Sequence, residues 1–189
     1  ITSLIEKVDN LIIVGAMANN FFIYKNFKIG KSLIEENTKE IIQLIYEKAK
    51  GKKCKIVIPE DCVVGSSFNS GGINKDLNII EDNDIILDIG PKTIKNIKDK
   101  IYQSNTVLWN GPAGYFENEN FMTGTMSIAE TISKNTVEKS LISIVGGGDT
   151  LAAIKKSKNK LSFTHLSTAG GAFLEYLEGK DLPGLSVLK

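Results

Sequence analysis

Arginine is missing from this 189-residue sequence, in which all 23 basic residues are lysines. Arginine supplies the planar, two-pronged donor that grips phosphates and carboxylates. An anion site made by this chain alone must therefore use lysine, backbone N–H groups, hydroxyls or a metal ion. The 22 acidic residues leave a net charge of +1, and the sequence has no basic stripe with interleaved aromatic residues. Nucleic-acid binding is therefore not indicated.

Cysteine and histidine are also scarce. Cys54 and Cys62 lack the paired spacing of a zinc or redox motif, so we expect both to be ordinary, partly buried residues. The single histidine, His165, excludes a multi-histidine metal site. No apolar run reaches membrane-spanning length, and no signal peptide opens the chain. These features favour a cytoplasmic protein with reduced thiols.

The composition that remains is typical of a folded domain. Hydrophobic residues make up 42% of the chain and charged residues 24%, so we expect a substantial core and one compact domain, residues 1–189. The chain begins at Ile1 without a methionine and enters an apolar run almost at once. We therefore expect it to be part of a longer protein.

Short apolar runs alternate with segments of helical periodicity along the whole chain. Strands are predicted at 11–14, 55–58, 85–88, 106–108, 141–145 and 161–165, and helices at 38–50, 92–102, 121–133, 150–157 and 171–177. The apolar runs are continuous rather than alternating, as in strands covered on both faces. The predicted fold is α/β: a three-layer αβα, Rossmann-like arrangement with a parallel sheet of about six strands and helices on both faces.

Helix and loop boundaries follow from a few residues. Asn37 is predicted to cap the helix 38–50, which Gly51 would end. Pro91 suits the first turn of the next helix. The glycine- and serine-rich stretch 65–82 is predicted to be an exposed loop or hairpin.

The predicted strand ends are rich in glycine and small polar residues. The turns begin at Gly15, Gly90, Trp109, Gly146 and Ser167. In parallel α/β sheets, ligands bind beyond the carboxyl ends of the strands. Five such turns would form a floor on which a flat, phosphate-bearing ligand lies close to the backbone.

The turn 146–150, Gly-Gly-Gly-Asp-Thr, carries the clearest chemistry. Glycines after a strand let the backbone approach a ligand, and the N–H groups at a helix start favour anions. A phosphate beside Asp149 needs an intervening cation, which predicts Mg²⁺ on that carboxylate, and Thr150 could donate a hydroxyl to a phosphate. The alternative, which stays open here, is that Asp149 only caps the helix.

The turn 167–171 is a second candidate, because its hydroxyls and glycines open a helix and could receive a phosphoryl group; a capping turn is the alternative. His165, at the end of a strand, is expected to be a packed core histidine rather than a base. The phosphate-binding GxxxxGK[ST] loop is absent. A GxGxxG turn is absent after the first strand, so a dinucleotide oxidoreductase is not favoured.

Six segments, in their order along the chain, resemble the carboxyl-terminal domain of the phosphoglycerate kinase family. They are VDNLIIVGAMANNFF (8–22), IGKSLIEE (29–36), LDIGPKTI (87–94), LWNGPAGYFE (108–117), SIVGGGDTLAAI (143–154) and HLSTAGGAFLEYLEGKDLPGL (165–185). The resemblance covers essentially the whole chain. It implies a glycolytic enzyme that reversibly transfers a phosphoryl group between 1,3-bisphosphoglycerate and ADP, giving 3-phosphoglycerate and ATP.

The resemblance also implies roles for individual residues. The adenine pocket would be formed by Gly15, Ala16, Leu33, Phe68, Gly90, Pro112 and Tyr115. Glu117 would bond the ribose, and Asp149 would hold Mg²⁺. The phosphates would lie near Asn110, Gly146, Gly147, Gly148 and Thr150. The phosphoryl group in flight would be stabilised by the catalytic turn of Thr168, Gly170 and Gly171.

The sequence departs from the family pattern at two positions. Tyr115 stands where the family has an aliphatic residue, so its ring could stack on adenine. Ala169 replaces the first of three glycines in the phosphate turn.

The resemblance implies a missing partner as well. The family's amino-terminal domain, which binds 3-phosphoglycerate, and the lysines that precede Ile1 are absent from this sequence. We therefore expect a domain that binds MgATP or MgADP but is essentially inactive alone, within a full-length monomer. The alternative is a stand-alone nucleotide-binding module without catalysis.

Overall fold

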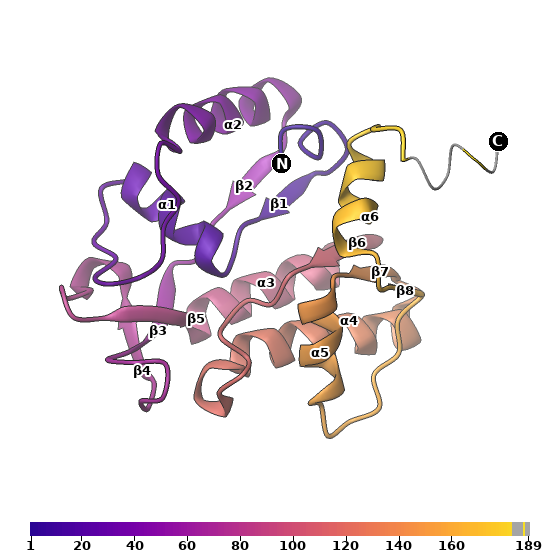
Figure 1. The fold of residues 1–189 in the computed structure, drawn as a ribbon. Helices are drawn as coiled ribbons and strands as arrows, with labels where there is room; N and C mark the ends of the chain where they lie inside the picture. Colours follow the sequence, from indigo (N-terminus) through magenta and orange to yellow (C-terminus); the bar gives the residue numbers. More distant parts are fainter. Residues whose placement is uncertain (183–186, 188–189) are drawn as a thin grey trace.

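The computed structural model describes residues 1–182 and 187, and it is a mixed α/β fold with short sheets (Figure 1). Strands β1 (Asn10–Ile12) and β2 (Lys55–Val57) pair in parallel. A second parallel sheet has the order β6 (Thr106–Asn110), β7 (Ile142–Gly146) and β8 (His165–Ser167). The third sheet is antiparallel and has β3 (Asp61–Gly65) between β4 (Ile73–Asp76) and β5 (Ile85–Ile89).

All six predicted strands occur within a few residues of their expected positions, but the single parallel sheet does not form among the described residues. The strand predicted at 85–88 is β5, and it pairs antiparallel with β3, which was not predicted. The stretch 65–82 contains β4, the second strand of a hairpin with β3. An apolar run marks a strand, but it carries no information on the partner or its direction.

The predicted helices occur as α2 (Lys39–Lys52), α3 (Pro91–Gln103), α4 (Thr123–Lys139), α5 (Gly148–Lys155) and α6 (Gly170–Leu177). Pro91 opens α3 as expected. The predicted ends of α2 were wrong. Asn37 has a φ of 58°, no side chain caps the helix, and α2 continues through Gly51 until Lys53 turns into the left-handed region.

Helix α1 (Ala16–Tyr24) was not predicted from the sequence. Its apolar residues do not follow a helical stripe, and two asparagines stand in its middle. Asn19 donates its side-chain amide to the Leu33 carbonyl at 2.9 Å, and Asn20 accepts the backbone N–H of Glu35 at 3.1 Å. Both are buried because they hold the chain after α1 against this helix.

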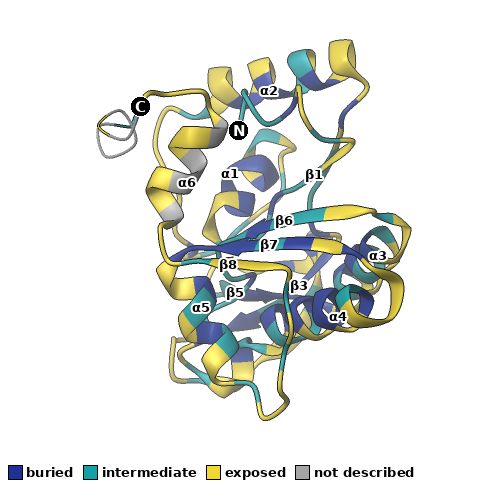
Figure 2. Ribbon diagram, turned by 90° about the vertical axis from the view of Figure 1, so that its right-hand side faces the viewer, coloured by how far each residue is buried: buried dark blue, intermediate teal, exposed yellow. Residues whose placement is uncertain are grey.

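The buried residues form two hydrophobic clusters, seen in dark blue in Figure 2. The first cluster joins α1, α2 and β3 around Phe21, Phe22 and Ile45. The second cluster joins α3, α4 and β7 around Ile132 and Val145. None of the described helices combines the length and the apolar character that crossing a bilayer requires.

Two buried aspartates on neighbouring strands hold the starts of helices. The Asp61 carboxylate on β3 accepts the backbone N–H groups of Lys92 and Thr93, in the first turn of α3, at 2.9 and 2.8 Å. Asp88 on β5 accepts the backbone N–H of Gly124, in the first turn of α4, at 2.8 Å. A carboxylate at a helix start satisfies free N–H donors and complements the helix dipole.

Candidate functional site

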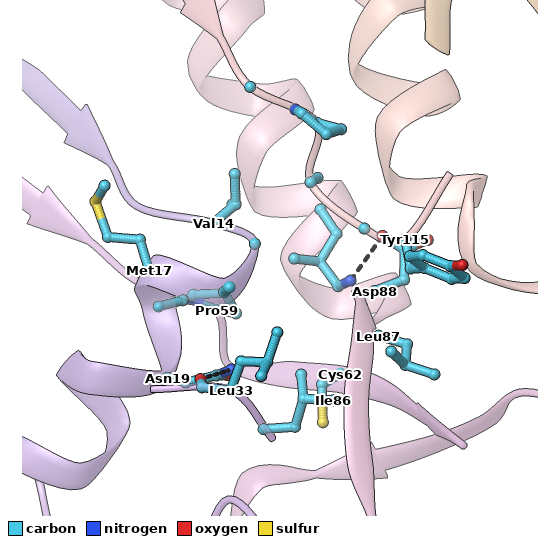
Figure 3. A pocket seen from close by; sticks show the side chains of 18 of the residues that line it. Val14, Met17, Asn19, Leu33, Pro59, Cys62, Ile86, Leu87, Asp88 and Tyr115 are labelled. Atoms are coloured by element: carbon cyan, nitrogen blue, oxygen red, sulfur yellow. Dashed lines mark hydrogen bonds between the residues drawn. The ribbon is translucent and has the colours of Figure 1, made fainter. Parts of the chain in front are cut away.

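A cavity of about 440 Å³ lies between the two clusters. Its volume falls within the range typical of small-molecule sites. Figure 3 shows Met17, Asn19 and Leu33 on one side and Leu87, Asp88 and Tyr115 on the other. Nine of the fourteen predicted nucleotide-binding residues line it: Gly15, Ala16, Leu33, Phe68, Asn110, Pro112, Tyr115, Glu117 and Asp149.

Gly15 forms one side of this cavity. Its φ of 65° puts it in the left-handed region that favours glycine, and it precedes the first residue of α1. A Cβ at Gly15 would lie 3.2 Å from the Pro112 carbonyl. The turn after β1 and the turn after β6 therefore approach each other closely, and glycine permits this approach.

The opposite side is the segment 111–117, which we call the wall segment. Several of its backbone N–H groups donate to neighbouring elements. Gly111 donates to Thr150 Oγ1 at 2.7 Å, Tyr115 donates to the Leu87 carbonyl at 2.7 Å, and Ala113 donates to Thr125 Oγ1 at 2.9 Å. Because neighbouring elements take up these donors, the wall segment is held in one conformation.

Thr125 provides a test of this arrangement. Its fully buried hydroxyl oxygen accepts the N–H groups of both Ala113 and Gly114. Thr125→Val keeps the shape but leaves one buried and one partly buried N–H donor unpaired, so we expect the free energy of unfolding to fall by about 2 kcal/mol. Thr125→Ser keeps the oxygen and should cost less than Thr125→Val. Urea denaturation checks this, and equal stability of the two variants would contradict it.

The far end of the wall segment is held by Lys156, which follows α5. Its ammonium donates to the carbonyls of Phe116 and Glu117 at 2.9 and 3.2 Å. It also lies over the Phe116 ring, 5.4 Å from the ring centroid. These contacts fix the backbone of Glu117, whose exposed side chain lines the cavity.

The placement of Phe68 at the cavity rests on two contacts with residues near the wall. Its ring meets Tyr115 edge to face, with centroids 4.9 Å apart. The Asn118 side chain donates to the Phe68 carbonyl at 2.8 Å. The structure therefore brings Phe68 to Tyr115, as the predicted adenine pocket requires.

The carboxyl ends of β6, β7 and β8 lie in one row. Asn110 is opposite Gly146, and Gly146 is opposite Ser167. Gly147, with a φ of 97°, leads into α5, and a Cβ there would lie 2.5 Å from the Asn110 amide oxygen. Asp149 follows in the first turn of α5, where its side chain is exposed and lines the cavity.

Five predicted nucleotide-binding residues are not in the lining of this cavity. Gly146, Gly147 and Gly148 lie beside it, at the end of β7 and the start of α5. Thr150 is fully buried, and its oxygen already accepts the Gly111 N–H, so it is not exposed to a phosphate. Gly90 packs on Asp61, because a Cβ there would overlap that carboxylate. Gly90 thus leaves room for the carboxylate that accepts the N–H groups in the first turn of α3.

The predicted catalytic turn lies at the start of α6, after β8. Gly170 opens the helix, and Thr168 and Gly171 are exposed. Thr168 and Gly171 are not among the described residues that line the cavity. The expectation that His165 is a packed core residue was wrong, since its side chain is exposed on β8.

Several apolar residues that line the cavity were not predicted from the sequence. Ile86 and Leu87 on β5 and Cys62 on β3 line the cavity. Burial raises the pKa of the Cys62 thiol to about 12. Asp88 was also missed, although a single aspartate inside an apolar strand, directly before Ile-Gly-Pro, is a signal that the sequence offers.

Asp88 is almost fully buried, with 2% of its surface exposed. Its second oxygen accepts the N–H of Ile89 at 2.8 Å. Burial raises the pKa of the Asp88 carboxyl from 3.8 to about 7, and the hydrogen bonds from the Gly124 and Ile89 N–H groups oppose this shift. The folded chain therefore holds a proton on Asp88 in a pH range where the unfolded chain has released it.

This shift predicts how stability depends on pH. The raised pKa contributes stability that is fully present below 3.8 and is lost as the pH rises through about 7. Asp88→Asn does not titrate, so the free energy of unfolding of the unchanged chain should fall relative to the variant across this window, by at most about 1.4 kcal/mol per pH unit. Urea denaturation of both proteins between pH 4 and pH 8 measures this. A difference that does not change with pH would contradict it.

The charges around the cavity all have one sign. The carboxylates of Asp88, Glu117 and Asp149 line it, and no lysine is among the lining residues that the structure describes. In the same part of the chain, no group of three or more His, Cys, Asp or Glu side chains could hold a metal by itself. An anionic ligand would need to bring a cation with it.

Comparison with known proteins gives consistent results. The family model for phosphoglycerate kinase matches residues 1–180. Phosphoglycerate kinase of Orientia tsutsugamushi (strain Boryong) is 46% identical and aligns with 100% of this chain and 47% of its own length. The corresponding protein of Chelativorans sp. (strain BNC1) is 40% identical, with 100% and 48% covered. The solved structure of phosphoglycerate kinase from Coxiella burnetii has a TM-score of 0.90 at 40% identity, with 98% of this chain and 47% of that chain covered. The chain thus spans about half the length of the relatives it matches.

Proposed function

The chain belongs to the phosphoglycerate kinase family, and from this premise we propose that residues 1–189 are the carboxyl-terminal half of such an enzyme and bind MgADP or MgATP in the cavity of about 440 Å³. One observation carries the proposal: nine residues predicted for nucleotide binding, from separate segments of the chain, line this one cavity. The whole enzyme would transfer a phosphoryl group between 1,3-bisphosphoglycerate and ADP. The other half of the protein would bind the phosphoglycerate.

In this proposal the apolar part of the cavity takes the base. Gly15 and Ala16 would flank one face of the adenine, and Pro112 and Tyr115 the other. Glu117, held by Lys156 through its backbone, would accept the ribose hydroxyls. The phosphates would extend toward Asn110 and the start of α5, where free N–H groups and the helix dipole favour anions.

The charge of the cavity supports a role for Mg²⁺. Phosphates beside the exposed carboxylates of Glu117 and Asp149 would be repelled, since the lining residues that the structure describes include no lysine. Mg²⁺ commonly uses one or two carboxylates together with substrate phosphates and water. The exposed carboxylate of Asp149 at the start of α5 fits this donor set, so Asp149 would hold the ion, which would neutralise the phosphates. Gly147 and Gly148 would keep the backbone close to them.

Phosphoryl transfer depends on positioning and on electrostatic stabilisation from both sides of the reacting group. The turn of Thr168, Gly170 and Gly171, at the start of α6, would supply the nucleotide side. The chain spans about half of its relatives, so we expect nucleotide binding by this chain and negligible turnover without the other half.

Calorimetry tests the proposal directly. Titration of the chain with ADP in excess Mg²⁺ should give saturable 1:1 binding, and the affinity should drop sharply when EDTA removes the metal. AMP, which lacks the second phosphate, should bind more weakly and depend less on Mg²⁺. No detectable heat with ADP at millimolar concentrations in Mg²⁺ would overturn the proposal.

A further inference from the structure

The Asp88 carboxylate lines the cavity, although the proposed function gives it no role. It has no cationic partner in any ion pair among the described residues. A buried carboxylate without a cation is costly, and such groups often mark functional sites. Its surroundings therefore need an explanation.

Those surroundings are shaped to the carboxylate. A Cβ at Gly114 in the wall segment, or at Gly124 in α4, would overlap Asp88. Glycine at both positions leaves the space that the carboxylate occupies. Three elements therefore meet at Asp88: strand β5, the wall segment and the first turn of α4.

The hydrogen bonds link Asp88 to the wall segment in two short steps. Its carboxylate holds the Gly124 N–H, and the next residue, Thr125, holds the N–H groups of Ala113 and Gly114. Its neighbour on β5, Leu87, accepts the Tyr115 N–H. A change at Asp88 thus acts on the backbone of the residues proposed to flank the adenine.

We propose that Asp88 is a positioning residue for nucleotide binding: its ionised carboxylate holds the start of α4 and the wall segment in place, and its protonation weakens nucleotide affinity. A carboxylate accepts N–H donors more strongly than a carboxylic acid does. The inference rests on the proposed function, because it concerns the same cavity.

Few other titratable groups lie near Asp88 on the elements packed around it. Those that line the same cavity on the packed elements are Cys62 on β3, Tyr115 and Glu117 on the wall segment, and Asp149 on α5. The first turn of α4 and residues 16–22 of α1 contain none. Burial keeps Cys62 as a neutral thiol, since its pKa is raised to about 12. The pKa of Asp88 is raised by burial and lowered by two N–H bonds.

The inference gives stability and affinity opposite dependences on pH. Protonation removes a buried charge, so it favours the folded chain over the unfolded one. Protonation also weakens the bonds that hold the wall segment, so it disfavours the bound nucleotide. A merely structural role would change stability with pH and leave the affinity of the folded chain for the nucleotide unchanged.

The experiment compares Asp88→Asn with Asp61→Asn. Asp61 is the matched control, because it is also a buried strand carboxylate at a helix start, but it does not line the cavity. MgADP affinity is measured by calorimetry from pH 6 to pH 8 for both variants and for the unchanged chain. Protonation of the nucleotide cancels in the ratio of dissociation constants of variant and unchanged chain.

For Asp88→Asn we expect this ratio to be about tenfold at pH 8, where one charged hydrogen bond is lost. It should fall toward one at pH 6, where the unchanged chain is itself protonated. For Asp61→Asn the ratio should not change with pH. A ratio for Asp88→Asn that is the same at both pH values would overturn the inference, whereas no MgADP binding by the unchanged chain would instead overturn the proposed function.

A measurement on the unchanged chain covers the case in which Asp88→Asn does not fold. The amide signals of Ile89, Gly124 and Ala113 in NMR spectra should titrate together, with one midpoint near 7. The pH dependence of adenosine binding should share that midpoint, because adenosine has no phosphates that titrate. The inference would also be overturned if the amide signals had different midpoints, or if the affinity for adenosine did not change with pH around 7.

Discussion

Asp149→Ala should weaken MgADP binding by about ten- to a hundredfold, which corresponds to the loss of one charge-assisted contact. Asp149 is exposed at the start of α5 and lines the cavity, and none of the lining residues described by the structure is a lysine. In the proposed site the metal ion bridges this carboxylate and the phosphates. Without the carboxylate, the ion loses its only protein ligand in the proposal. Calorimetry with ADP in excess Mg²⁺ measures the effect.

The same variant should behave differently when EDTA removes the metal. Asp149 then only repels the phosphates, so Asp149→Ala should bind ADP as well as the unchanged chain does, or better. Asp82→Ala removes another exposed carboxylate, which is paired with Lys28 outside the cavity, and it should leave both affinities unchanged. Equal weakening of Asp149→Ala with and without Mg²⁺ would contradict the metal assignment.

Gly124→Ala should lower the free energy of unfolding by about 3 kcal/mol, although the same change in a helix usually stabilises. Gly124 lies in the first turn of α4, and a Cβ there would overlap the Asp88 carboxylate and the Ile89 side chain. Both of those side chains are buried and cannot move aside freely. The start of α4 would have to shift and lose its bond to Asp88.

Gly51→Ala is the matched control, because Gly51 also lies in a helix but a Cβ there would meet nothing within 4 Å. This variant should gain up to about 1 kcal/mol from the higher helix propensity of alanine. Chemical denaturation of both variants gives the comparison. Effects of the same sign for the two substitutions would contradict the account of the Asp88 contacts.

Individual helices and strands were predictable from the sequence where the hydrophobic periodicity was clear or where a proline marked a helix start. Pro91 marks the start of α3, and the apolar runs mark the strands. The pairing of the strands was not predictable. The apolar runs of β3 and β5 are compatible with a parallel or an antiparallel neighbour, and their antiparallel register depends on the whole fold. Helix α1 was missed because Asn19 and Asn20 break its pattern, yet both are buried to bind the chain around Leu33 and Glu35.

The residues that meet at the cavity were predictable mainly through the family resemblance. Periodicity alone predicts glycine turns at strand ends, but it does not bring Phe68 to Tyr115 or Gly15 to Pro112. A family motif did not locate Gly90 correctly. The absence of a side chain at this position leaves space for the Asp61 carboxylate, and Gly90 does not line the cavity. The side chains of the floor, such as Leu87, could not be distinguished from ordinary core residues, since a cavity is a property of packing between distant segments.

The cavity between the two hydrophobic clusters has a consequence for cooperativity. Each cluster is a contiguous packed unit, and such units open separately when few contacts join them. The lining includes Phe22 and Cys62 from the first cluster and Ile89 and Ala113 from the second. A ligand that touches all four adds its binding free energy only when both units are closed. Bound nucleotide would thereby add a connection between the two clusters to the one that the β3–β5 pairing already makes, so that the chain resists partial opening as well as complete unfolding.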